Sequence, residues 1–520
     1  MNVINLLSSS RITNDVKCDI CIIGAGAAGI YLAVRLASHG KDVALVEAGD
    51  YTCREDTAVG FEAEFTDHIY SGATKGRAFG VGGTTATWGG LLIPHLTYDL
   101  PMSGADNFNT WENIVRRVNE KSDEVLGLLS LKNVDFSKDA QKDLGNAYKI
   151  LAQAGLDSFS GIHLPFRHKN FAHLLTKKEC KDSLLRLYVN AVVSSWNIIS
   201  AGSSSSRIQS LEAVARNGKK ITVTANRYVI AAGTIESTRL LLEIEECYPH
   251  KVISGSNSLG VCLSDHLSMK IANVTEPWLE RTSQLFAPHF TKGCMRGFRF
   301  IDSKAPFGVP KAFSHFIFEN EYPAFALAKE VLLSFQRKRL PKITCSQLSK
   351  GIAGLFSLAY KRFMKNTLYI PAGTKAHFQL DVEQKPDMNN RIFLGKGKDI
   401  YGRRKVSIQW RITDVDMKAI KAAVARIISI WPGGTKGLPE LQPLKIDYEA
   451  EKPYDAYHPV GTCRMGDDFD AVVDFDLKVR GLRNLWVAST GVLPRVGSAN
   501  PTFTLLCLTE ALSEKLLIEE

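Results

Sequence analysis

The sequence predicts an α/β protein in two parts, one on a largely parallel sheet and one on a mostly antiparallel sheet with flanking helices. Three observations carry this prediction. A strand, a glycine-rich turn, a helix and a second strand follow one another between residues 19 and 47. Another apolar strand ends in Ala-Gly at 228–233, and the last 60 or so residues return to strand, glycine loop and helix. Strands that alternate with helices are typical of a parallel sheet.

Composition excludes several classes of protein. The chain has 520 residues, 45% hydrophobic and 23% charged, which is ordinary for a globular protein and excludes disordered or collagen-like chains. Ten cysteines are too few for a disulfide scaffold, and we interpret Cys18 and Cys21 as core residues. The net charge of +10, from 64 basic and 54 acidic residues, mildly favours an acidic partner, and we expect no nucleic acid partner.

The N-terminal residues and the lengths of the apolar stretches indicate in which compartment of the cell the protein is expected. The N-terminal residues lack the apolar segment of a secretory signal, and no stretch of about 20 apolar residues occurs. We therefore expect a cytoplasmic protein.

The first βαβ unit has the pattern of a dinucleotide site. A buried strand at 19–23 leads into Gly24-x-Gly26-x-x-Gly29, a helix at about 30–37 and a strand at 43–46, followed by Glu47. The glycines allow a tight turn and a close approach of the backbone to a pyrophosphate, which also gains from the helix dipole. Glu47 is placed to bond a ribose hydroxyl. This pattern fits NAD and FAD equally.

The remaining elements are predicted from periodicity and turn residues. The glycine-rich stretch 72–90 is interpreted as a functional loop, and 110–156 as helical. Residues 187–232 predict an antiparallel meander with the serines 203–206 at a hairpin tip. We further expect helices at 237–245, 414–430 and 502–517 and strands at 377–382 and 406–410.

Seven motifs in order along the chain carry a resemblance to a known family. They are GAGAAG at 24–29, GVGGTTATWGG at 80–90, YVIAAGTIESTRLLL at 228–242, SLGVCLSDH at 258–266, EQKPDMNNRIFL at 383–394, HPVGTCRMG at 458–466 and SANPTFT at 498–504. The chain resembles the glucose–methanol–choline (GMC) flavoprotein oxidoreductases. In its motifs it is most similar to the sugar and polyol dehydrogenase and choline dehydrogenase-like branch.

The resemblance implies a Rossmann-like three-layer domain that binds FAD. The implied cofactor-binding residues are Gly24, Gly26, Ala28, Gly29, Glu47, Gly82, Gly83, Val193, Ala232, Asn500, Pro501 and Thr502. Some family members attach FAD through a histidine in the glycine-rich loop. Thr87 stands at the aligned position, so we expect non-covalent FAD. We assign no residue to a metal ion.

The family's catalytic pair falls on His458 and Asn500. An alcohol carbon can give up hydride only as its hydroxyl proton leaves, so a base must stand within hydrogen-bond reach. A neutral imidazole is suited to this task, and Asn500 would donate a hydrogen bond to the same oxygen. We interpret His95 and His266 as structural residues.

The expected function is FAD-dependent oxidation of a CH–OH group on a sugar, a polyol or a glycosylated intermediate, by a dehydrogenase rather than an oxidase. The electron acceptor stays open. The alternatives are a flavin-dependent lyase on the same fold, an NAD-dependent dehydrogenase and a flavin-binding protein without catalysis. An inactive protein would be expected to lose His458 or Asn500, and both are present.

The expected FAD-binding domain comprises 1–110, 157–270 and 455–520, and the expected substrate domain comprises 111–156 and 271–454. Within the latter, 329–365 is rich in Lys and Arg with apolar runs between them. Such a segment is compatible with peripheral contact with an anionic membrane, and the alternative is a solvated face over the substrate domain.

Overall fold

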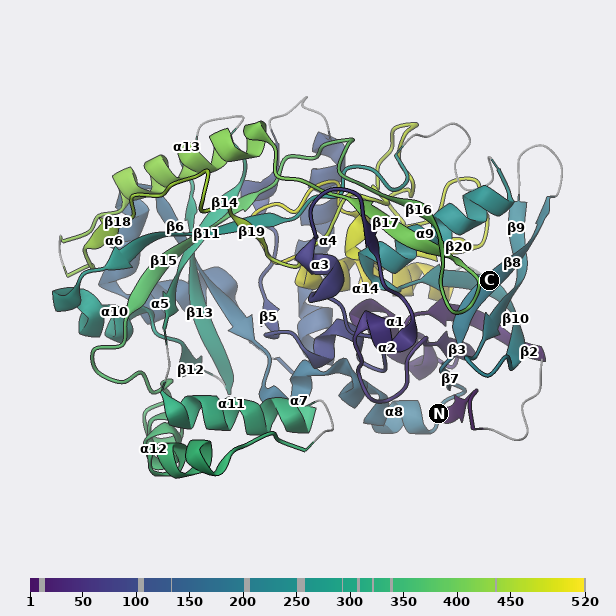
Figure 1. Cartoon of the computed structure of the whole chain (residues 1–520), viewed down its shortest axis with the longest axis horizontal. Coiled ribbons are helices and arrows are strands. Elements are labelled where there is room, and N and C mark those ends of the chain that lie inside the picture. Colours follow the sequence, from purple (N-terminus) through teal and green to yellow (C-terminus); the bar gives the residue numbers. More distant parts are fainter. Residues whose placement is uncertain are drawn as a thin grey trace.

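The computed structural model describes residues 1–8, 15–101, 107–131, 133–200, 206–249, 258–291, 293–305, 309–319, 322–336, 340–434 and 437–518. Figure 1 shows two large sheets, with the strands of the first on the right and those of the second on the left. The fold class is as predicted.

The first sheet is largely parallel. Its strands lie in the order β1 (Asn2–Asn5), β7 (Arg186–Val189), β3 (Val43–Val46), β2 (Asp15–Ile23), β10 (Lys220–Ile230), β9 (Ser206–Val214) and β8 (Val192–Ser200), and β20 (Leu485–Val487) also pairs with β10. Pairing is parallel from β1 to β10 and antiparallel from β10 to β8. The meander is therefore confirmed, while serines 203–205 lie outside the described residues.

Three helices pack beside this sheet and share one apolar core with it. They are α1 (Ala27–Ser38), α4 (Phe108–Leu128) and α14 (Thr502–Ile518), and α14 contacts both of the others. Helix α1 is buried along most of its length, as its run of apolar residues predicts. Cys21 is fully buried in β2, and Cys18 is partly buried against the same core.

The second sheet is antiparallel throughout. Its order is β18 (Leu441–Pro443), β11 (His266–Val274), β15 (Ala376–Glu383), β14 (Ala312–Phe318), β13 (Cys294–Asp302), β6 (Leu156–His163) and β5 (Leu91–Leu92), with β12 (His289–Thr291) on β13 and β19 (Tyr454–Asp455) on β11. Its apolar face packs in a second core against α5 (Phe136–Leu144), α6 (Asn146–Ala154), α10 (Leu279–Phe286) and α13 (Asp414–Ile430).

Smaller elements connect the two sheets. The strands β16 (Arg391–Lys398), β17 (Arg404–Gln409) and β4 (Glu64–Phe65) form a third sheet. The remaining α-helices are α2 (Asp56–Val59), α3 (Ser71–Thr74), α7 (Phe166–Lys169), α8 (Lys178–Lys181), α9 (Gly233–Cys247), α11 (Pro323–Gln336) and α12 (Cys345–Met364). The 3₁₀ turns are η1 (Gly83–Ala86), η2 (Thr97–Asp99), η3 (Phe171–Thr176), η4 (Glu276–Trp278) and η5 (Thr490–Val492). No described helix is both long enough and apolar enough to cross a membrane.

Local capping explains where some helices begin. Helix α13 starts at the predicted residue because Thr413 and Asp416 form a capping box, in which each side chain accepts a backbone N–H of the other. The predicted helical stretch 110–156 instead divides into α4, α5 and α6. Asp135 caps α5, and Gly145, with a positive φ, separates α5 from α6.

Packing differs from the expected division into domains at several places, of which two involve whole elements of eight residues or more. Helix α4, expected with the substrate domain, buries Trp111, Ile114 and Val118 in the first core. Strand β6, expected with the first domain, hydrogen-bonds along its whole length to β13 in the second sheet. Chain order alone could not separate these segments, since both parts are assembled from interleaved pieces.

Candidate functional site

A cavity lies at the carboxyl ends of β2, β3 and β10, where parallel α/β sheets commonly bind their ligands. Ten of the predicted site residues line it: Gly24, Gly26, Ala28, Glu47, Gly83, Val193, Ala232, His458, Pro501 and Thr502. Gly29, Gly82 and Asn500 are not among the lining residues, although each is next in sequence to a residue that is. Segments far apart in the sequence thus converge on one cavity, as the motifs predict.

Two glycine loops face each other across this cavity. Gly26 precedes α1, and a Cβ built there would meet only the carbonyl oxygen of Ala231, at 4.0 Å. Gly83 comes from the second loop, and a Cβ on it would stand 2.9 Å from the Cα of Gly26. The backbones can therefore approach closely while the space beside Gly26 stays open. The start of α1 and this open space fit the pyrophosphate of a dinucleotide.

Glu47 is engaged differently from the prediction. Its carboxylate accepts backbone N–H groups from Ala25 at 2.7 Å, Gly49 at 2.9 Å and Gly80 at 3.0 Å. It thereby ties the two glycine loops to the end of β3. Burial raises the pKa of Glu47, and the backbone hydrogen bonds oppose that rise. Because Glu47 also lines the cavity, its contact with a ribose stays a prediction.

His458 and Asn500 are brought together. The Nε2 atom of His458 lies 2.9 Å from the Nδ2 atom of Asn500. Asn500 was expected to donate to a substrate oxygen, but here its amide faces the imidazole. Its Oδ1 atom is buried and has no hydrogen-bond partner among the described residues. Just beyond it, Pro501 and Thr502 place the start of α14 at the cavity, where the helix dipole favours negative charge.

His266 is in direct contact with His458, although it was interpreted as a structural residue. The two Nδ1 atoms lie 3.1 Å apart, and the Nε2 atom of His266 lies 2.9 Å from the carbonyl oxygen of Gly497. A carbonyl only accepts, so Nε2 of His266 carries a proton. Burial lowers the pKa of His266, which leaves its ring neutral and its Nδ1 atom an acceptor.

The tautomer of His458 follows from this contact. Its Nδ1 must donate to His266, so its Nε2 is unprotonated and accepts a hydrogen bond from the amide N–H of Asn500. Burial lowers the pKa of His458 to about 3, which keeps the ring neutral. His458 thus presents an unprotonated nitrogen to the side on which Asn500 lies.

Asp265 fixes the backbone on which His458 stands. Its carboxyl group accepts the backbone N–H of His458 at 2.9 Å and that of His266 at 2.7 Å, and it is bonded to the hydroxyl of Tyr70. Burial raises the pKa of Asp265 to about 8, against the lowering effect of these hydrogen bonds.

His95 is buried, and its ring nitrogens bond Thr504 and the carbonyl of Val496, each at 2.7 Å, consistent with a structural role.

The second sheet turns a polar face toward this site. In β15, Phe378, Leu380 and Val382 enter the second core, so Gln379 and Asp381 lie on the opposite face. Asp381 accepts a hydrogen bond from Ser268 of β11 and lies 3.3 Å from Nδ1 of His315. Although burial opposes it, these neighbours and Arg299 hold the pKa of Asp381 at about 2.

Arg299 of β13 shares this polar face. Its guanidinium lies over the ring of Phe313, 5.0 Å from the centroid, and its Nε atom is buried without a hydrogen-bond partner among the described residues. Burial lowers its pKa to about 10.

The sequence did not predict the residues of this polar face, because 267–382 matches no motif. The alternation of polar and apolar residues at 377–382 was the available signal.

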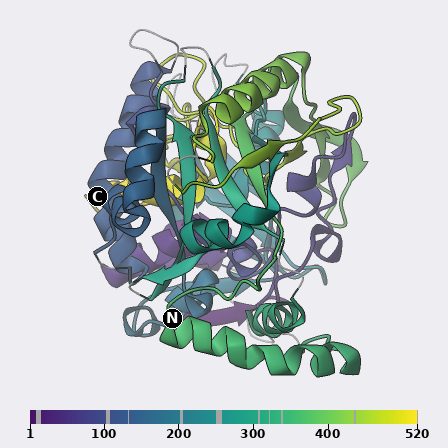
Figure 2. The ribbon, with the colours of Figure 1, turned by 90° about the vertical axis from the view of Figure 1, so that its left-hand side faces the viewer.

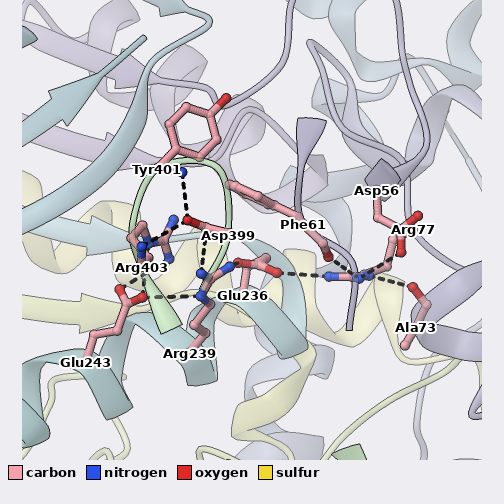
Figure 3. Close-up of polar contacts among 10 residues, drawn as sticks. All are labelled: Asp56, Phe61, Ala73, Arg77, Glu236, Arg239, Glu243, Asp399, Tyr401 and Arg403. Atoms are coloured by element: carbon pink, nitrogen blue, oxygen red, sulfur yellow. Dashed lines mark hydrogen bonds and ion pairs between the residues drawn. The ribbon is translucent and has the colours of Figure 1, made fainter. Parts of the chain in front are cut away.

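A buried ion network supports another wall of the cavity (Figure 3). Arg239 of α9 pairs with Asp399 at 2.6 Å and with Glu243 at 3.2 Å, and Arg403 pairs with Glu243 at 3.0 Å. Arg77 bonds Glu236 at 2.9 Å, extending the network to the segment before the second glycine loop. Of these residues Arg77, Glu236 and Arg403 line the cavity.

Comparison with known proteins gives matches at both ends of the chain. Residues 386–509 match the family model described as GMC oxidoreductase, and residues 22–81 match an NAD(P)-binding Rossmann-like domain. The first match contains His458 and Asn500, and the second contains the Gly24 loop and Glu47. The chain belongs to the GMC oxidoreductase family.

Individual GMC proteins resemble this chain locally in sequence. An alcohol dehydrogenase [acceptor] of Pseudomonas putida is 45% identical over 58 residues, which are 11% of this chain and 10% of that protein. Pyridoxine 4-oxidase of Microbacterium luteolum is 60% identical over 38 residues, 7% of this chain and 8% of that protein. The aligned stretches thus span about a tenth of these relatives' length.

In three dimensions a likeness to a solved structure extends over nearly the whole chain. The crystal structure of pyridoxine 4-oxidase from Mesorbium loti superposes with a TM-score of 0.61 at 18% identity, covering 97% of this chain and 100% of that one. At this level of identity the comparison establishes the shared fold.

Proposed function

We propose that this GMC-family protein binds FAD without a covalent bond and oxidises a hydroxyl group of a small polar molecule. The observation that carries the proposal is the imidazole of His458, which lines the cavity that the two glycine loops border and whose contacts with His266 and Asn500 leave Nε2 unprotonated. FAD, when bound, supplies the acceptor for the hydride of the alcohol carbon. The protein supplies the base and the binding surfaces.

Each predicted site residue would have its own role in binding FAD or in proton transfer. Gly24, Gly26, Gly29 and Ala28 would hold the pyrophosphate, with Gly82 and Gly83 opposite. Glu47 and Val193 would contact the ribose and adenine end. Ala232, Pro501 and Thr502 would border the ring system. His458 would take the hydroxyl proton on Nε2 once the Asn500 amide turns from that nitrogen to donate its hydrogen bond to the substrate oxygen.

Two observations support the finer claims. Among the described residues that line the cavity, His458 is the only histidine, and Thr87 stands where a covalent attachment would require one. Non-covalent FAD should therefore leave the protein on acid precipitation. The polar face around Gln379, Asp381 and Arg299 supports a substrate rich in hydroxyl groups, such as a sugar or a polyol.

An anaerobic screen of sugars, polyols and simple alcohols tests the proposal. We expect the visible absorbance of the oxidised flavin to bleach with at least one of them and to return on adding an acceptor. We propose a dehydrogenase, so a quinone or dye should restore the absorbance faster than air does. Turnover without bleaching would instead identify a lyase, and a protein purified without flavin absorbance would support an NAD-dependent enzyme.

A further inference from the structure

The helices α11 and α12 form a pair at one edge of the molecule, which we call the α11–α12 pair (residues 323–364). Figures 1 and 2 both show these green helices along the lower edge. Helix α12 begins with a capping box, in which Thr344 and Gln347 exchange side-chain and backbone bonds. The chain just after α12 is joined to β12, since Phe290 donates its N–H to the carbonyl of Asn366 at 2.6 Å.

One face of α12 is used for packing within the pair. A Cβ on Gly351 would stand 2.9 Å from the side chain of Leu327, and one on Gly354 would stand 2.7 Å from that of Ala324. These small residues let α11 and α12 approach closely. The face of α12 that carries these two glycines is therefore packed against α11.

The opposite face of α12 is apolar and exposed. Leu348, Ile352, Phe356 and Tyr360 recur every four residues and form one stripe along the helix, which ends at Phe363. Phe356 is 78% exposed and Phe363 74%. A stripe of this kind costs hydration free energy unless something covers it.

Exposed large hydrophobic residues are concentrated in this part of the chain. Of the 23 large hydrophobic residues exposed in the described parts of the chain, ten lie between 331 and 364. Four of the ten lie outside α12: Val331, Leu332, Phe335 and Leu340. The other six lie on α12 and are the stripe residues and Met364. Exposed apolar residues are thus found on both helices of the pair.

Charge indicates what covers the patch. Residues 322–365 contain nine basic residues and one acidic residue, a net charge of 9 − 1 = +8. Lys329, Lys342, Lys350, Lys361 and Lys365 are exposed, and none forms an ion pair with a described residue. Two copies of this surface would repel each other, whereas an anionic lipid surface would attract it.

We propose that the α11–α12 pair binds to the surface of an anionic membrane, with the apolar stripe of α12 entering the boundary between headgroups and acyl chains. Long lysine side chains can extend from the helices to lipid phosphates while their stems cover apolar surface. The pair lies on the membrane, because neither helix is apolar enough to cross it.

Vesicle cosedimentation of the full-length protein tests this proposal. We expect binding to vesicles of phosphatidylcholine mixed with phosphatidylglycerol, little binding to phosphatidylcholine alone, and loss of binding as salt rises. Phe356→Ser combined with Phe363→Ser should weaken binding by about tenfold or more, since each ring buries apolar area in the bilayer boundary. Lys361→Gln combined with Lys365→Gln should weaken it similarly by removing lipid attraction.

Matched controls use exposed residues elsewhere. Ile69→Ser with Phe469→Ser removes side chains that are 69% and 66% exposed, and Lys396→Gln with Lys418→Gln removes two exposed charges. Both control proteins should bind as the wild type does. Flavin content and thermal unfolding of every variant check that it is folded.

Two results would overturn the proposal. One is a wild-type protein that ignores anionic vesicles or binds neutral vesicles equally well. The other is a wild-type dimer without vesicle binding that Phe356→Ser and Phe363→Ser convert to a monomer, since a second copy would then cover the stripe. Neither result depends on whether the protein oxidises an alcohol.

Discussion

Nδ1 of His266 stands 3.1 Å from Nδ1 of His458, and this contact decides which nitrogen of His458 is free. The carbonyl of Gly497 can only accept a hydrogen bond, which places the proton of His266 on Nε2 and leaves its Nδ1 to accept from His458. His266 is thus a positioning residue, even though it lies one ring away from the cavity.

His266→Asn should release His458 to exchange between tautomers. We expect flavin reduction by a substrate to slow by about tenfold or more, because the free nitrogen would no longer always be Nε2. Imidazole ¹⁵N NMR should show His458 protonated on Nδ1 in the wild type and a tautomer mixture in the variant. An unchanged NMR signature would mean that His266 only fills space.

His458→Ala should separate binding from chemistry. The variant should retain FAD, since the glycine loops are untouched, while flavin reduction slows by about 10²–10⁴-fold through loss of the base. Stopped-flow absorbance under anaerobic conditions measures the rate. Reduction at the wild-type rate would remove His458 from the mechanism.

Gly26→Val should abolish FAD retention without unfolding the protein. The new side chain has space within the fold, with only the carbonyl of Ala231 nearby at 4.0 Å, but it would occupy the place of the pyrophosphate. Flavin absorbance after purification measures retention. Gly127→Val is the control, because that glycine in α4 also has open space beside it. A fully yellow Gly26→Val protein would contradict the phosphate loop.

Arg239→Leu should destabilise the protein by roughly 3–5 kcal/mol, because it leaves Asp399 and Glu243 as buried charges with one partner fewer. Denaturant unfolding measures the loss. Arg116→Leu, which breaks the exposed pair with Glu120, should cost less than about 1 kcal/mol. Equal effects of the two substitutions would show that the network in Figure 3 adds no stability.

His163→Gln should make stability less sensitive to acid. Burial lowers the pKa of His163 to about 4 from an ordinary value of 6.5, so between these values the unfolded chain binds a proton that the folded chain does not. This contribution is therefore complete above about pH 6.5 and is lost as the pH falls toward 4. Thermal unfolding at pH 7.5 and 5 should show the variant losing less stability than wild type, by up to about 2 kcal/mol. Parallel losses would contradict a His163 that stays neutral in the folded protein.

The fold could be predicted where short-range signals were strong. Strand 43–46 and helix 414–430 begin and end as expected because buried runs and a capping box mark them. The place of α4 could not be predicted, since its apolar stripe does not say which core it faces. The cavity residues were predictable from motifs, whereas the polar face with Asp381 and Arg299 was not. Those residues come from separate strands and are brought together only by the sheet register.

The placement of β20 has a consequence for biosynthesis. This strand, residues 485–487, completes the parallel pairing beside β10, and His458, Asn500 and α14 come from the same end of the chain. While the ribosome still holds this end, the Gly24 loop can already exist, but the wall formed by Pro501 and Thr502 cannot. We therefore expect the nascent protein to stay colourless until α14 has emerged from the ribosome.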